Sequence, residues 1–297
     1  MTTNVIEIRQ LTKDYGNNRG IFDVSLSVKK GEVFGFLGPN GAGKSTTIRH
    51  LMGFIQADQG SCQINGLDCL RDHARIQQAL GYLPGEIAFM DDMTGLEFIK
   101  FMAKMKGMTD LTKAYELMER FELNPQGKIK KMSKGMKQKI GIICAFMHDP
   151  ELLILDEPSS GLDPLMQNRF IELVLEEKQR GKTIFMSSHI FEEIERTCDR
   201  TAMIKDGRLI SIEELQTLKA SKHKTYQIMF ATEELAEQFM NEGFECEQVE
   251  STVVKVLPRN NLNYLLATLS HYDIVDLDIT KLTLEELFLH FYGGNES

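Results

Sequence analysis

Long apolar runs are absent from this sequence. No window approaches the roughly eighteen consecutive apolar residues that a membrane-spanning helix needs. The first residues, Met1 to Glu7, also lack the basic start and the apolar stretch of a signal peptide. We therefore expect a chain that does not cross a membrane itself, so that any role at a membrane comes through a partner.

Paired cysteines and an excess of basic charge are missing as well. The five cysteines are irregularly spaced, and no two of them have the C-x-x-C spacing of a metal or redox site. Reduced thiols in a cytoplasmic protein are therefore expected. The formal net charge of −9 is the opposite of the basic footprint of a nucleic-acid-binding protein, so no nucleic-acid partner is expected.

Strand-like and helix-like segments alternate through the first 215 residues. Residues 24–28 alternate apolar and polar, and residues 32–37 and 152–155 are nearly all apolar, as is typical of buried strands. The pattern also predicts a strand at 183–186, helices at 46–52, 93–106, 112–121, 136–147 and 164–179, and a hairpin turn at Asn65-Gly66. Strands alternating with helices favour a mostly parallel sheet. We expect an α/β domain over residues 1–215, with a helical subdomain at about 88–150.

The pattern changes after about Leu215. Strand-like and helix-like segments follow one another in β-α-β-α-β order, at residues 226–230, 233–241, 244–256, 262–272 and 274–279. This order in a short stretch predicts a small, separate α+β domain over residues 216–297.

A glycine-rich loop lies between the strand predicted at 32–37 and the helix predicted at 46–52. Its residues, Gly38-Pro39-Asn40-Gly41-Ala42-Gly43-Lys44-Ser45, fit the phosphate-binding pattern G-x-x-x-x-G-K-[ST] in the structural context that this pattern requires. Glycines let backbone N–H groups approach phosphate oxygens, and the helix start at Thr46 adds partial positive charge. Lys44 is expected to reach the β- and γ-phosphates of ATP, and the Ser45 hydroxyl to bind Mg²⁺.

Two carboxylates, Asp156 and Glu157, follow the apolar run at 152–155. A buried strand delivers its last side chains to the carboxyl edge of the sheet, where ligands bind in folds of this kind. Asp156 is expected to hold the Mg²⁺ shell, and Glu157 to polarise the attacking water as a general base. Taken alone the pair is weak evidence, since acidic residues often end strands where the chain emerges into water.

These motifs together resemble the P-loop NTPases of the ATP-binding cassette (ABC) superfamily, over roughly residues 5–215. The distinctive segment is Met132-Ser133-Lys134-Gly135-Met136-Lys137-Gln138, which is similar to the family's L-S-G-G-Q signature. The resemblance implies that Ser133 and Gly135 contact the γ-phosphate of ATP bound by the opposite subunit. It therefore implies a homodimer, or a dimer with a second ATPase subunit, that closes head-to-tail around two ATP molecules.

Three further positions resemble family motifs. Ser160-Gly161-Leu162-Asp163 is similar to the D-loop, which touches the opposite subunit, and Asp163 is expected beside the nucleotide. His189 resembles the switch histidine that contacts the γ-phosphate and orders the attacking water. Tyr15 resembles the aromatic residue that stacks on adenine. Outside this context, a lone histidine or tyrosine is more often an ordinary surface or core residue.

Two departures from the family pattern stand out. The family has a glutamine after Tyr82-Leu83-Pro84 in its Q-loop, where this chain has Gly85-Glu86. In the signature, Lys134 and Met136 replace a glycine and the glutamine. Both departures leave the basal rate of turnover open, and no Mg²⁺ contact is assigned to Glu86.

Two segments bear on partners. Residues 87–108 are rich in methionine and phenylalanine at helical spacing, a pattern equally consistent with plain core and with a surface that receives a membrane subunit. Residues 282–291 resemble the closing helix of bacterial drug- and antibiotic-exporter ATPases, whose permease is a separate chain. In such proteins the C-terminal domain is expected to stabilise the dimer or to regulate it, and the alternative is a passive appendage, between which the sequence does not decide.

The sequence thus predicts the ATP-binding and ATP-hydrolysing subunit of an ABC transporter, in which Glu157, His189 and Lys44 carry the chemistry. By resemblance it is a bacterial exporter subunit, peripheral on the cytoplasmic face of the membrane and powering a separate transmembrane permease. The alternatives are an ATP-binding regulatory protein with little turnover and a non-transport ABC protein acting on ribosomes or DNA. The single phosphate loop and the acidic charge count against the second of these.

Overall fold

The chain folds into two compact units. The computed structural model describes residues 3–90, 92–215, 224–257 and 262–281, and the contacts divide the chain into Met1–Leu215 and Gln216–Ser297. Within the described ranges, no helix combines the length and apolar character needed to cross a bilayer.

A mostly parallel sheet forms the centre of the first unit. Its strand order is β10-β9-β3-β8-β7-β6, in which only β10 pairs antiparallel. The strands are β3 (Val33–Leu37), β6 (Gly81–Leu83), β7 (Leu152–Asp156), β8 (Thr183–Ser188), β9 (Arg200–Lys205) and β10 (Arg208–Glu214). Every residue of β3, β7 and β8 is buried, as their apolar runs predict, because helices and a second sheet cover both faces. The α/β architecture predicted from the sequence is confirmed.

A second, antiparallel sheet packs near the first. It has the order β2-β1-β4-β5, from β1 (Asn4–Asp14), β2 (Gly20–Lys29), β4 (Gln59–Ile64) and β5 (Leu67–Asp68). Strands β4 and β5 are joined at Asn65 (φ 52°) and Gly66 (φ 76°). Positive φ at both residues is the geometry of a type I′ hairpin turn, which the Asn-Gly pair predicted.

One apolar core joins the two sheets through α1 (Lys44–Leu51). Ile48 and Leu51 of this helix belong to the same cluster as core residues of both sheets. Within it, the rings of Phe34 and Phe185 stack with centroids 5.9 Å apart. Because this packing fixes α1 against β3, the loop between them is held on a rigid base.

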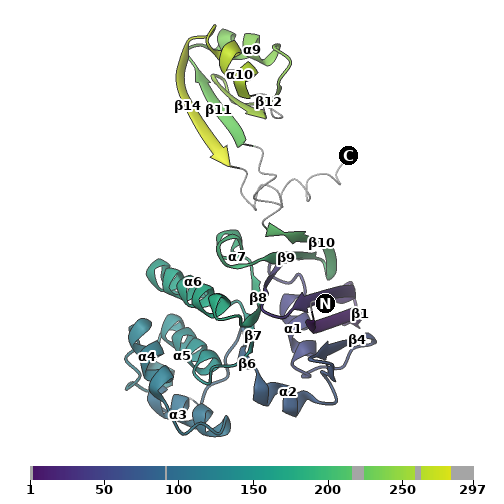
Figure 1. Ribbon diagram of the computed structural model, residues 1–297, viewed down its shortest axis with the longest axis vertical. Coiled ribbons are helices and arrows are strands. Elements are labelled where there is room, and N and C mark those ends of the chain that lie inside the picture. The colour runs from purple at the N-terminus through teal and green to yellow at the C-terminus, as the bar shows by residue number, and fades with distance from the viewer. Residues whose placement is uncertain (1–2, 91, 216–223, 258–261, 282–297) are drawn as a thin grey trace. The chain divides into compact units, whose positions relative to one another are not determined.

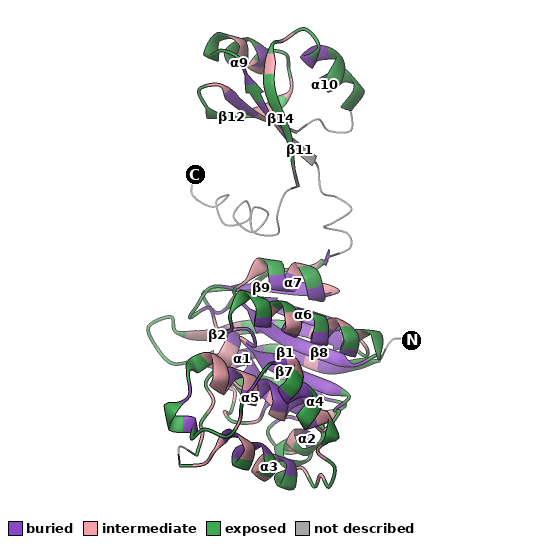
Figure 2. Ribbon diagram, turned by 90° about the vertical axis from the view of Figure 1, so that its left-hand side faces the viewer, coloured by how far each residue is buried: buried purple, intermediate pink, exposed green. Residues whose placement is uncertain are grey.

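The helical insert occupies one end of the first unit. Its helices are α3 (Gly95–Met105), α4 (Thr112–Arg120) and α5 (Lys134–Phe146), and Figure 1 shows them on the opposite side of the central strands from β1 and β4. Thr94 and Glu97 form a capping box that begins α3. The remaining helices of the unit are α2 (His73–Ala79), α6 (Pro164–Gln179) and α7 (Phe191–Thr197). Figure 2 shows the buried strands β7 and β8 beneath helices whose outer faces are exposed.

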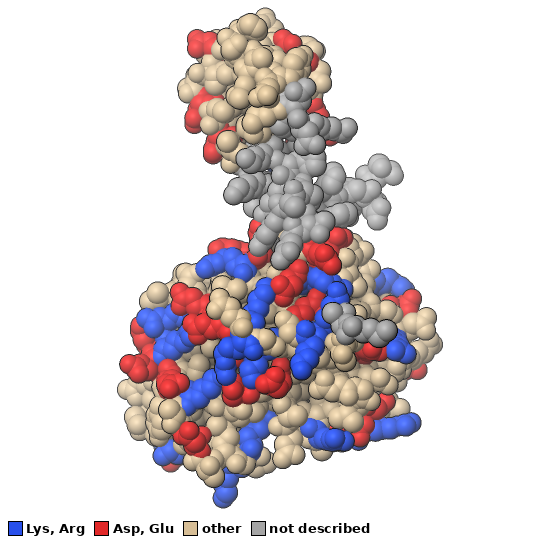
Figure 3. Space-filling model, viewed as in Figure 1, with Lys and Arg blue, Asp and Glu red and all other residues tan. Residues whose placement is uncertain are grey.

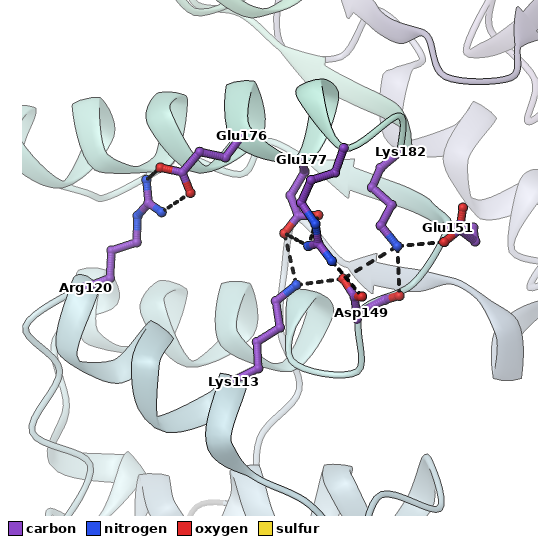
Figure 4. A network of polar contacts seen from close by, with 8 residues as sticks. Lys113, Arg120, Asp149, Glu151, Glu176, Glu177 and Lys182 are labelled. Atoms are coloured by element: carbon purple, nitrogen blue, oxygen red, sulfur yellow. Dashed lines mark hydrogen bonds and ion pairs between the residues drawn. The ribbon is translucent and has the colours of Figure 1, made fainter.

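A network of charged side chains ties α4 to the sheet layer (Figure 4). Lys113 pairs with both Asp149 (2.8 Å) and Glu177 (3.0 Å). Arg180 and Lys182 approach the same Asp149 carboxylate. Hydrogen bonds from Arg180 and Lys113 hold the pKa of Asp149 well below its usual range, although burial opposes them. The insert is therefore anchored to α6 and to the start of β8 by several coupled contacts instead of one exposed pair.

In its described residues, 224–257 and 262–281, the second unit is a four-stranded antiparallel sheet with two helices. Its elements are β11 (Lys224–Phe230), α9 (Glu233–Met240), β12 (Glu245–Glu250), β13 (Val253–Leu257), α10 (Leu262–Leu269) and β14 (Ile274–Lys281). The sheet order β12-β13-β11-β14 gives this βαββαβ chain the ferredoxin-like arrangement. Phe230, Phe239 and Tyr272 pack together at its core.

One element prediction in the second unit is wrong in detail. The run at 244–256, read as one strand, is the hairpin β12–β13, which turns at Ser251 and Thr252. No glycine, proline or asparagine marks this turn, so the strand pattern passes through it without interruption. The closing helix predicted at 282–291 lies outside the described residues.

Candidate active site

The glycine-rich loop connects β3 to α1 at the carboxyl edge of the parallel sheet. Gly41 (φ 83°) and Gly43 (φ 110°) adopt left-handed conformations, which glycine reaches without strain. A side chain at Gly38 could not be accommodated, since its Cβ would lie 2.4 Å from the carbonyl oxygen of Ile204. Helix α1 begins at Lys44 without a side-chain cap, so the N–H groups of its first turn are free to bind an anion.

Lys44 folds back across this loop. Its side chain is only 5% exposed, and its Nζ donates to the carbonyl oxygens of Gly38 (2.6 Å) and Pro39 (3.1 Å). These bonds hold the loop in a curve around the ammonium group. The positive charge is therefore fixed within the phosphate loop.

Asp156 and Glu157 diverge at the end of β7. Asp156 is buried, and its Oδ1 accepts a 2.5 Å hydrogen bond from Ser187 Oγ on the neighbouring β8. Glu157 has φ 51°, a left-handed conformation that costs energy in a residue with a side chain, and its N–H is held by Ser187. Gln138 Nε2 secures the same turn by donating to the carbonyl oxygen of Pro158 (2.8 Å). This kink turns Glu157 away from Asp156 and towards the phosphate loop.

Glu157 contacts both of the other residues predicted to carry the chemistry, Lys44 and His189. Its Oε1 lies 2.9 Å from Lys44 Nζ, and its Oε2 accepts a short hydrogen bond from His189 Nδ1. The Glu157 side chain is 17% exposed and that of His189 is 45% exposed. Residues from the ends of three separate elements thus form one contiguous acid–base group at the edge of the sheet.

Two cavities flank this group. The first, of about 500 Å³, is lined by Tyr15, Asn18, Arg19, Gly20, Asn40, Gly41, Gly43, Lys44, Ser45, Thr46, Glu157, Asp206 and Gly207. Tyr15 is 55% exposed, and Lys13 Nζ lies over its ring, 5.8 Å from the centroid. The second cavity, of about 650 Å³, is lined by Ser45, Asp156, Glu157 and His189 and extends to the helical insert.

Ser133, Gly135 and Asp163 lie outside these cavities, whereas Ser160 of the D-loop segment lines the second one. Ser133 is the N-cap of α5, with its Oγ accepting from the N–H of Met136 (3.2 Å), and Asp163 is the N-cap of α6. Neither residue lines a cavity with the phosphate loop, and neither does Gly135. Within one chain, therefore, the residues expected to contact the nucleotide fall into two separate groups.

The structure shows which residues surround the two departures from the family pattern. Gly85 packs against the catalytic edge, where an added Cβ would lie 3.0 Å from Asp156 Oδ2, so a side chain here would force a shift. Glu86 lines the second cavity. In the signature, Lys134 Nζ donates to Ser160 Oγ (3.0 Å) and its stem lies against Gly161, which ties the signature to the D-loop.

The donor set suits Mg²⁺. The Ser45 hydroxyl and the Asp156 carboxylate line the same cavity and both offer oxygen, the ligand that this ion prefers. Among the described residues no cluster of three or more His, Cys, Asp or Glu side chains could hold a metal alone. Such a sparse protein contribution fits an ion that takes the rest of its shell from water and nucleotide phosphates.

Several residues at this site were not predicted from the sequence. Arg19 and Asp206 line the first cavity, while Gln138 and Ser187 fix the Glu157 turn. No short motif contains Arg19 or Asp206, and Gln138 lies in the signature segment without a role predicted for it, because these residues reach the site only through the tertiary fold. For Ser187 a signal was present, since it lies in the strand that ends beside His189.

A phosphate loop between a parallel strand and a helix, facing an acid pair on the next-but-one strand, defines a P-loop ATPase. Comparison with known proteins gives the family. The family described as "ABC transporter" matches residues 21–160, and a family described as "AAA domain, putative AbiEii toxin, Type IV TA system" matches residues 128–195.

Relatives that align along nearly the whole chain support the same family. The chain is 34% identical to the linearmycin resistance ATP-binding protein of Bacillus subtilis, covering 97% of this chain and 98% of the relative. It is 32% identical to the bacitracin transport ATP-binding protein of Bacillus licheniformis, covering 98% of each. A solved ATP-binding subunit of an ABC transporter is 30% identical, with a TM-score of 0.66 over 80% of this chain and 95% of that one. The chain therefore belongs to the ATP-binding proteins of ABC transporters, which bind and hydrolyse ATP.

Proposed function

We propose that this chain powers a separate transmembrane permease, as one half of a dimer that closes around two ATP molecules. The geometry that carries the proposal is the contact of Glu157 with both Lys44 and His189 beside a cavity of nucleotide size. The separation of Ser133 and Gly135 from that cavity supports a site that only a second subunit completes. A homodimer is the simplest form, and a second ATPase subunit is the other.

In this mechanism the loop N–H groups and Lys44 bind the phosphates and stabilise charge that develops during phosphoryl transfer. Ser45 and Asp156 would hold Mg²⁺, which adds positive charge at the same phosphates. Glu157 Oε2 accepts a proton from the attacking water, and His189 orients that water and the γ-phosphate. Because Lys44 Nζ lies 2.9 Å from Glu157 Oε1, a phosphate that binds Lys44 competes with this carboxylate for the ammonium group.

The second cavity is the proposed docking surface for the permease. It opens between the catalytic edge and the insert, and its apolar rim includes Phe54, Ala88, Phe98 and Met102. The methionine- and phenylalanine-rich stripe predicted at 87–108 contains both core and surface residues. Phe98 is 7% exposed and packs in the core, whereas Met90 is 46% exposed and Met105 is 67% exposed. A permease helix seated here would touch Glu86 and so sense the state of the site.

The proposed substrate class rests on the names of the relatives alone. Their names refer to linearmycin resistance and to bacitracin transport, which supports export of lipid-like, drug or peptide molecules. On this proposal the chain lies on the cytoplasmic face of the membrane, held there by the permease.

Phe54→Asp is expected to reduce recovery of the permease at least about tenfold, because a charge placed in a desolvated apolar contact is costly. Phe54 is 53% exposed, so the variant should fold. The measurement is recovery of a multi-span protein with the tagged chain from detergent-extracted membranes of its native cell. Leu70→Asp is the matched control, since Leu70 is 41% exposed, does not line the cavity and lies outside the 87–108 stripe. Equal recovery with both variants, or no integral membrane protein at all, would contradict the proposal.

The Gly85 and Met136 departures favour one other function, an ATP-binding regulatory protein with little turnover. It predicts tight ATP binding without measurable hydrolysis even when the permease is present. Steady-state phosphate release by the copurified complex separates the two.

A further inference from the structure

Glu193, in the first turn of α7, is a carboxylate buried beside the active site. The residue is 3% exposed, and its Oε2 accepts a 2.6 Å hydrogen bond from Ser188 Oγ. Its Oε1 has no partner of good hydrogen-bonding geometry among the described residues. Such a group is expensive to bury, and none of the steps described above uses it.

The Ser188 hydroxyl carries the influence of Glu193 to His189. This hydroxyl donates to Glu193 and accepts from the N–H of Ile190 (3.0 Å), so it bridges the residues on both sides of the histidine. The adjacent Ser187 makes similar contacts, since its hydroxyl donates to Asp156 Oδ1 and accepts from the N–H of Glu157. Two neighbouring serines at the end of β8 thus organise the two halves of the acid–base group.

The ionisation of Glu193 is shifted by its surroundings. Burial raises the pKa of Glu193 to about 7, and the nearby Glu157 raises it as well, while the hydroxyls of Ser188 and Ser159 and the charge of His189 lower it. Across the window from 4.5 to about 7, the native state binds a proton that the unfolded chain has lost. The carboxylate therefore destabilises the fold increasingly as pH rises through that window. Because the buried Glu193 carboxylate lowers the stability of the fold, a role in function explains it better than a role in stability.

We infer that Glu193 is a positioning residue for hydrolysis, which holds the turn around His189 in its working shape through the Ser188 hydroxyl. The inference rests on the proposed catalytic roles of Glu157 and His189. Glu193 acts through its hydrogen bond with Ser188. The charge of the side chain is dispensable to this role, and its hydrogen-bond acceptor is essential.

Three variants test this. Glu193→Leu removes the acceptor and is expected to lower kcat for MgATP about 10- to 100-fold with KM nearly unchanged, since a small displacement of a catalytic group has effects of this size. Glu193→Gln keeps an acceptor for Ser188 and should retain most of the activity. Glu192→Leu, on the exposed neighbouring residue, is the matched control and should hydrolyse ATP at the wild-type rate.

Thermal melting separates positioning from support of the fold. Glu193→Gln should melt higher than wild type at pH 8, and the gain should shrink towards pH 5 as the native carboxyl becomes protonated. If Glu193→Leu fails to fold, Ser188→Ala replaces it and should give the same loss of kcat. Wild-type kcat in both Glu193→Leu and Ser188→Ala would overturn the inference. If Glu157→Gln also hydrolyses normally, the proposed mechanism fails as well; if Glu157→Gln is inactive, only the role of Glu193 fails.

Discussion

Glu157→Gln is expected to lower kcat for MgATP hydrolysis by about 10²- to 10⁴-fold, the range that removal of a general base produces. ATP binding should persist, because the phosphate loop and Lys44 remain. The amide cannot take a proton from water, although it preserves the size of the side chain, and its one oxygen can still accept from Lys44 or from His189. Single-turnover phosphate release and ATP affinity, measured on the same preparation, check both halves of this result.

The same variant should also trap the dimer. With hydrolysis blocked, ATP stays between the subunits, and a sizing column run with ATP should show a dimer that disappears without nucleotide. Glu172→Gln is the control, since the Glu172 side chain is 63% exposed on α6 and lines neither cavity. A Glu157→Gln variant that turns over ATP at the wild-type rate would remove Glu157 from the mechanism.

Lys44→Ala is expected to lower kcat about 10²- to 10³-fold, as loss of one preorganised charge at a transferring phosphoryl group does. Unlike Glu157→Gln, it should also weaken ATP binding strongly. The ammonium group sits inside the loop and bonds Gly38 and Pro39, so its loss removes charge and relaxes the curve of the loop. Titration with a fluorescent ATP analogue, followed by phosphate release, measures both effects.

An exposed lysine provides the control for this variant. Lys100→Ala, on the outer face of α3, changes the net charge equally and should leave binding and turnover intact. Equal ATP affinity in Lys44→Ala and wild type would place the phosphates elsewhere on the molecule.

Much of the first unit was predictable because its signals are local. Helix α6 spans Pro164–Gln179, the predicted range, since Asp163 caps it and Pro164 fits its first turn. The Asn65-Gly66 turn is equally local. The β12–β13 hairpin was missed because no glycine, proline or asparagine marks its turn.

The active-site residues also divide into those with a local sequence signal and those without one. The phosphate loop and the acid pair are contiguous in sequence, and their placement on strand ends brings Lys44, Glu157 and His189 into contact. Gln138 and Glu193 act through buried contacts between distant segments. No spacing rule links them to the residues they hold, so only the folded chain reveals them.

The central claim is that each ATP is hydrolysed between two subunits, and mixing two inactive variants tests it most directly. Glu157→Gln lacks the base, and Ser133→Arg blocks the signature of its own subunit. In a mixed dimer, one site combines the intact Glu157 of one subunit with the intact Ser133 of the other. Each variant alone should be inactive, and a 1:1 mixture should recover up to about a quarter of the wild-type rate, because half of the dimers are mixed and each has one of two equivalent sites. Mixed dimers that are isolated with two different tags and still hydrolyse no ATP, or a Ser133→Arg variant that is active alone, would contradict the shared site.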